Sequence, residues 1–81
     1  MNAASIEETL RAASGKRVEI QFRDGHVVLA RVVSTDFEAP AEVIYDVLEV
    51  LSCGPDKYAL VRPGVVAAAP LDEISKVLLL P

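Results

Sequence analysis

The chain has 81 residues, of which 52% are hydrophobic and 25% are charged, and its formal net charge is −4. This length suffices for one small domain with one core, and the composition is that of a folded protein rather than a disordered one. The acidic balance excludes the basic surface typical of non-specific nucleic-acid binding. With one cysteine, one histidine and no tryptophan, the chain has no internal disulfide or zinc cage. We expect a single cytoplasmic domain over residues 1–81, with no membrane span, no bound metal and no cofactor.

The first predicted element is a short amphipathic helix from about Ile6 to Ala13. Ser5 and Glu8 have the spacing of a capping box, in which a serine before the helix and a glutamate three residues later bond reciprocally to backbone amides. Gly15 follows as a residue type that commonly ends helices. Because so short a helix is marginal alone, we expect it to pack on a sheet.

A β-hairpin follows the helix. Residues 18–22 alternate apolar and polar side chains, which is the period of a half-buried strand. Asp24 and Gly25 match a type I′ turn, in which both central residues have positive φ. The second strand runs from His26 to about Thr35 and is apolar on both faces. We expect His26 to be an exposed residue at the end of the hairpin.

Three further strands and one turn complete the predicted order. The third strand spans Val43 to Leu51, and the last spans Lys76 to Leu80. The fourth spans Tyr58 to Val61, with residues 65–69 as its continuation, and Pro70 to Ile74 form a single helical turn. Several short strands in so small a chain favour a barrel, whose closure would remove unpaired sheet edges. We therefore predict a mainly β fold with a short N-terminal helix and five strongly bent strands.

The hairpin and the residues after it resemble the first motif of the Sm and Sm-like (LSm) family. Asp24-Gly25 stands at the family's turn, Ala30 where it has a glycine, and Asp36 at its aspartate. Pro40 stands where the family has an asparagine. The run Val61-Arg62-Pro63-Gly64-Val65-Val66 resembles the second motif, with a proline inserted between the arginine and the glycine.

This resemblance implies an SH3-like barrel that forms rings and binds short single-stranded RNA at the inner rim. The residues it assigns to an RNA or ligand rim are Asp36, Phe37, Arg62 and Gly64. Because Pro40 offers no amide to read a base, we expect the family's uridine pocket to be lost. Phe37 is interpreted either as a base-stacking residue or, more commonly for a lone aromatic beside a turn, as a cap on the open end of the barrel.

No pattern in the chain indicates an enzyme, since it has no Gly-rich phosphate loop, nucleophile elbow or zinc spacing. Cys53 would need His26 beside it to act as a nucleophile, and we expect the two in separate loops. The acidic residues Asp36, Glu38 and Glu42 are interpreted as a solvated loop rather than a cation site.

Two hypotheses follow for function. The first is a non-enzymatic Sm-like protein that assembles with itself into a ring through its fourth and fifth strands, with RNA or another ligand at a rim. The alternative is an SH3-like module that binds another protein and no nucleic acid. The motif spacing favours the first hypothesis, and the acidic balance with Pro40 favours the second.

Overall fold

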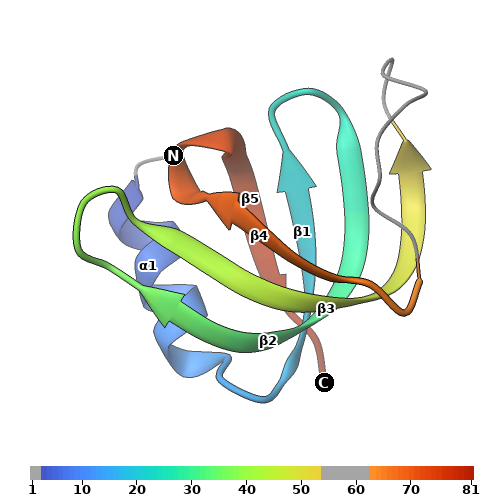
Figure 1. Cartoon of the computed structure of the whole chain (residues 1–81), viewed down its shortest axis with the longest axis horizontal. Coiled ribbons are helices and arrows are strands. Elements are labelled where there is room, and N and C mark those ends of the chain that lie inside the picture. Colours follow the sequence, from blue (N-terminus) through green and yellow to red (C-terminus); the bar gives the residue numbers. More distant parts are fainter. Residues whose placement is uncertain (1–2, 54–62) are drawn as a thin grey trace.

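The computed structural model of the chain describes residues 3–53 and 63–81 (Figure 1). The elements in chain order are helix α1 (Ala3–Ala12), strands β1 (Arg17–Phe22), β2 (His26–Asp36), β3 (Glu42–Cys53) and β4 (Val66–Pro70), the one-turn 3-10 helix η1 (Leu71–Glu73) and strand β5 (Ile74–Leu79). The predicted mainly β fold with one short N-terminal helix is confirmed. The strand predicted over Tyr58–Val61 lies outside the described residues, and β4 is the segment predicted as its continuation. In the described part of the chain, no helix is long and apolar enough to cross a membrane.

The five strands form one antiparallel sheet in the order β4-β3-β2-β1-β5. Strands β2 and β3 are the longest, and Figure 1 shows both curving strongly. Their register shifts at three places, and such bulges increase the bend and twist of a strand. Among the described strands no ladder joins β4 to β5, so the sheet keeps two free edges. The expectation that barrel closure removes the edges is therefore not met.

The predicted hairpin is confirmed, but the predicted turn type is wrong. Strands β1 and β2 pair from Arg17↔Arg31 to Gln21↔Val27, so three residues, 23–25, connect Phe22 to His26. Gly25 has φ +100°, whereas no other residue type in the described part of the chain has a positive φ. The backbone N–H of Gly25 donates to the Phe22 carbonyl at 3.1 Å. This is the three-residue hairpin loop whose last residue is left-handed, rather than a two-residue type I′ turn.

Helix α1 packs against β5, β2 and η1. It buries Ile6 and Leu10, and the next residue on that face, Ala13, is buried just beyond the helix, as predicted. The helix begins at Ala3, so Ser5 lies inside it and the predicted capping box is wrong. The physical reason is that alanines are strong helix formers and extend the helix toward the N-terminus.

The core is formed by side chains from α1, η1 and all five strands. Tyr45 is the largest side chain in it, 2% exposed, and its ring lies 6.4 Å from that of Phe22. The other buried members are aliphatic: Ile6, Leu10, Ala13, Val18, Ile20, Val28, Ala30, Val32, Val43, Val47, Ala69, Leu71, Ile74 and Val77. The core is therefore built from light side chains, as the composition predicts.

Candidate functional site

Asp36 is the last residue of β2 and its side chain is exposed. Its Oδ1 accepts a hydrogen bond from the backbone N–H of Glu38 at 3.0 Å. This is the usual way in which an aspartate side chain shapes a turn. Asp36 therefore stabilises the turn of the β2–β3 connection. The Sm-like resemblance instead predicts that this residue lies at a ligand rim.

Phe37 is half-buried and packs against the core. The guanidinium carbon of Arg11 lies 4.3 Å from the centre of its ring, a cation–π contact. One face of Phe37 is therefore covered by α1, and a base could stack on that face only by displacing Arg11. This arrangement favours the interpretation of Phe37 as a cap over the core.

Gly64 lies just before β4, with φ +88°, and its N–H donates to the Val47 carbonyl at 2.9 Å. Asp36 is paired with Glu42, which in turn is paired with Pro70 at the far end of β4. Five residue positions along β3 thus separate Gly64 from the level of Asp36, or roughly 17 Å at about 3.3 Å per residue. The structure does not bring these two predicted rim residues together, and Arg62 lies outside the described residues.

Among the described strands, the one that follows Gly64 is β4. The resemblance places the arginine and glycine immediately before the fifth strand, whereas Gly64 precedes β4. The segment before β5 is η1, which carries Asp72 and Glu73. The connection before β5 is therefore acidic.

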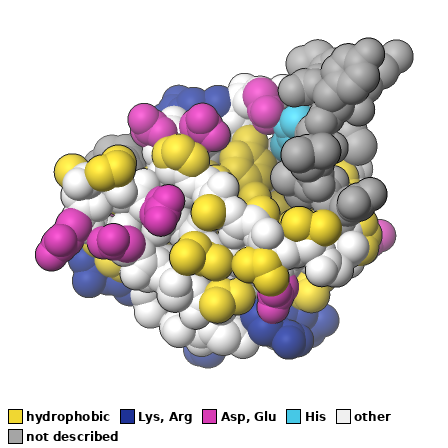
Figure 2. All heavy atoms as spheres, in the orientation of Figure 1, with side chains coloured by type: hydrophobic (Ala, Val, Ile, Leu, Met, Phe, Trp, Pro, Cys, Tyr) yellow, Lys and Arg dark blue, Asp and Glu magenta, His cyan; other side chains and the backbone are white. Residues whose placement is uncertain are grey.

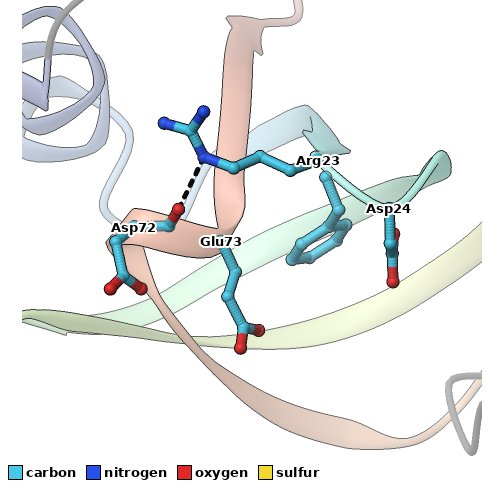
Figure 3. A pocket seen from close by; sticks show the side chains of 5 residues that line it. Arg23, Asp24, Asp72 and Glu73 are labelled. Atoms are coloured by element: carbon cyan, nitrogen blue, oxygen red, sulfur yellow. Dashed lines mark hydrogen bonds between the residues drawn. The ribbon is translucent and has the colours of Figure 1, made fainter.

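A pocket of about 390 Å³ lies between the end of the hairpin and η1, lined by Phe22, Arg23, Asp24, Asp72 and Glu73 (Figure 3). Arg23 closes one side of it, because its Nε donates to the Asp72 carbonyl at 2.6 Å and its backbone N–H donates to the Glu73 carbonyl at 2.9 Å. Reasoning from sequence missed this site because its two halves are far apart along the chain. Both contacts of Arg23 join the hairpin to η1. We therefore assign the pocket a structural role and no ligand.

His26 is 7% exposed, so the prediction of an exposed hairpin residue is wrong. Its Nδ1 lies 2.8 Å from Oδ2 of Asp24, and its backbone N–H donates to Oδ1 of the same carboxylate at 2.9 Å. These hydrogen bonds, the backbone one first, hold the pKa of Asp24 below its usual value. Nε2 is buried and has no hydrogen-bond partner among the described residues.

The expectation that His26 and Cys53 lie in separate loops is also wrong. His26 begins β2 and Cys53 ends β3, and the two are direct partners in the β2–β3 register. For Cys53, the described contact is this pairing of its backbone with that of His26. The acidic residues Asp36, Glu38 and Glu42 are exposed, and in the described part of the chain no group of three histidine, cysteine or acidic side chains could hold a metal ion.

The two free edges of the sheet carry exposed aliphatic side chains. On β4, Val66 is 61% exposed, and on β5, Leu78 and Leu79 are 37% and 45% exposed. Strand β4 has no charged residue and β5 has one, Lys76. Native edges are usually protected by charges or coverage. Within the described part of the chain, these two edges therefore have little protection by charge.

The hydrogen-bond pattern shows which backbone groups are free at each edge. Leu80 donates to the Arg17 carbonyl at 3.0 Å, so by alternation the amides of Val77 and Leu79 point away from β1. Val47 donates to the Val65 carbonyl at 2.9 Å, so the amide of Val66 points away from β3. Each edge thus offers a row of backbone groups to an incoming strand.

Comparison with known proteins adds no relationship: no family model matches the chain, and neither does any curated protein or solved structure.

Proposed function

We propose that the chain is a non-enzymatic assembly module that pairs β4 of one copy with β5 of the next. The observation that carries the proposal is the pair of free, almost uncharged edges with exposed aliphatic side chains. Pairing satisfies the outward backbone groups of both edges and buries those side chains together. The assembly hypothesis made from the sequence also used the fourth and fifth strands, and β4 is the described continuation of the predicted fourth strand.

An antiparallel register of these edges sets Val66 against Leu79 of the neighbouring copy. Both residues direct their backbone groups outward, as the pairing requires, and both are about half exposed or more. Removing each of these side chains from water contributes about 1 kcal/mol. Pro70 has no N–H to donate, so it limits the paired length at the end of β4.

Because the two edges differ, the interface is heterologous. Such an interface does not produce a two-fold dimer in which one patch meets itself; it produces a ring when the rotation closes and a filament when it does not. We propose a closed homo-oligomeric ring, in which each copy uses both of its edges.

The experiment is the solution mass by light scattering at two protein concentrations, for the wild type and for Val66→Lys and Leu79→Lys. We expect a stable mass of several protomers for the wild type and monomers for both variants. Val33→Lys is the matched control, because Val33 is 50% exposed on β2, away from both edges. A wild-type monomer at both concentrations would contradict the proposal.

RNA binding at a rim, which the resemblance implies, would require a base to displace Arg11 from the covered face of Phe37, and Asp36 and Gly64 lie apart. Fluorescence anisotropy with oligo-U and oligo-A tests it; binding that weakens steeply with salt would support it. A monomeric chain that binds neither oligonucleotide would favour the alternative, an SH3-like module whose free edges receive a strand from another protein.

A further inference from the structure

A basic depression of about 550 Å³ lies where the end of β5 meets the start of β1. Its charged rim consists of Lys16, Arg17 and Arg31, and its apolar wall includes Leu79 and Leu80. All three cationic side chains are exposed. Figure 2 shows a group of Lys and Arg side chains along the lower edge of the molecule, on the side where Figure 1 places the C-terminal end.

Backbone pairing keeps the main chains of these three cationic residues close together. Arg17 and Arg31 are direct partners in the β1–β2 register, and such partners have Cβ atoms about 5 Å apart. The backbone N–H of Val32 donates to the Lys16 carbonyl at 3.1 Å, and Gly15 donates to the Val32 carbonyl at 2.9 Å. The segment after the helix is thereby fastened to β2, which keeps Lys16 beside the arginine pair.

No close ion pair with a side-chain carboxylate is described for this cluster. Like charges opposite each other in a sheet are destabilising. Asp46 is the register partner of Arg31 on β3, but no carboxylate side chain in the described part of the chain lies within 4.0 Å of the charged nitrogens of these three residues. Arg17 donates from Nη2 to the Pro81 carbonyl oxygen at 3.2 Å, which leaves its other N–H groups available. In a chain of net charge −4, three such cations on one depression need an explanation.

We infer that this depression binds a phosphate group carried on a small apolar body, that is, a phosphomonoester. A phosphate dianion matches a cluster of three cations, and guanidinium groups bind its oxygens through paired N–H donors. Leu80 provides the surface against which the apolar part of the ligand packs. The site is open to solvent, so we expect dissociation constants of order 1 mM, equivalent to about −4 kcal/mol.

This inference goes beyond the proposed assembly and depends on different residues. The test is a titration followed by backbone amide chemical shifts, with inorganic phosphate, phenyl phosphate and benzoate at constant ionic strength. We expect saturable shifts at residues 15–17 and 31, with phenyl phosphate binding about threefold or more tighter than inorganic phosphate because of the added apolar contact, and benzoate binding more weakly than phenyl phosphate.

The variants Lys16→Gln and Arg31→Gln should each weaken phenyl phosphate binding about tenfold, the effect of losing one charge-assisted hydrogen bond. Lys76→Gln is the matched control, because Lys76 is an exposed cation on β5 that does not line the depression. Light scattering on the same samples reports whether assembly is intact, so failure of the ring and failure of this site are distinguishable. Absence of saturable shifts, equal binding of benzoate, or unchanged binding in both variants would overturn the inference.

Discussion

The Asp24 carboxylate holds His26 through two of its atoms: Oδ2 lies 2.8 Å from Nδ1, and Oδ1 accepts the backbone N–H of His26 at 2.9 Å. The same residue pair therefore closes the hairpin and orients a buried imidazole. Asp24 itself is exposed, with a side chain 57% accessible to solvent. Its contribution to stability is local and moderated by water.

Replacing Asp24 by alanine should lower the stability of the protein in a pH-dependent way. The pKa of Asp24 is lowered in the folded state, first by the backbone N–H of His26 and then by its side chain. A lowered pKa means that the contribution is present above the unfolded pKa and is lost as the pH falls through the folded pKa. Thermal unfolding at several pH values should show a deficit for Asp24→Ala near neutral pH that shrinks below about pH 4. The stability of Asp24→Asn, which keeps an oxygen acceptor, should fall between those of the wild type and Asp24→Ala. A deficit of Asp24→Ala that does not change with pH would contradict this account.

Gly25→Val should destabilise the fold by about 2 kcal/mol, because a β-branched residue resists positive φ. Gly25 has φ +100° and its N–H closes the turn onto Phe22. Chemical denaturation of the variant measures the loss. Gly25→Asn is the control, since asparagine adopts left-handed conformations more readily. An unchanged denaturation midpoint for the valine variant would show that the turn tolerates another backbone conformation.

Phe37→Ala should cost about 1–2 kcal/mol of stability, because the ring is half-buried against the core and covered by Arg11. Arg11→Ala, which removes only the covering guanidinium, should cost about 0.5 kcal/mol. Thermal denaturation of both variants tests this order. The reverse order, or a Phe37→Ala protein as stable as the wild type, would argue against Phe37 as a cap.

Local patterns were sufficient to predict the elements near the N-terminus. Alternation over residues 18–22 predicted β1, and the apolar run after Gly25 predicted β2 as its hairpin partner. The apolar face of Ile6 and Leu10 predicted how α1 packs. These features depend on residues close in sequence, where periodicity and propensity dominate.

Features that depend on distant segments were not predictable. An Asp-Gly pair suits both two-residue and three-residue hairpin loops. In this protein the loop has three residues, and the Asp24 carboxylate accepts a hydrogen bond from the backbone N–H of His26. The burial of His26 depends on the β2–β3 pairing, and the position of Gly64 before β4 rather than β5 depends on where the fourth strand forms. For the site, the sequence supplied Asp36 and Phe37 as candidates, but their turn and core contacts appear only in three dimensions.

The pairing of β1 with β5 makes the first and last strands of the chain neighbours. Ile20 and Val77, both core residues, are register partners across this ladder, although most of the chain separates them. During synthesis the ribosome must therefore release β5 before β1 gains its second neighbour. Until then the apolar face of β1 lacks this neighbour, and the β1–β5 ladder closes a contact of very large sequence separation, a kind of contact that forms slowly compared with a hairpin.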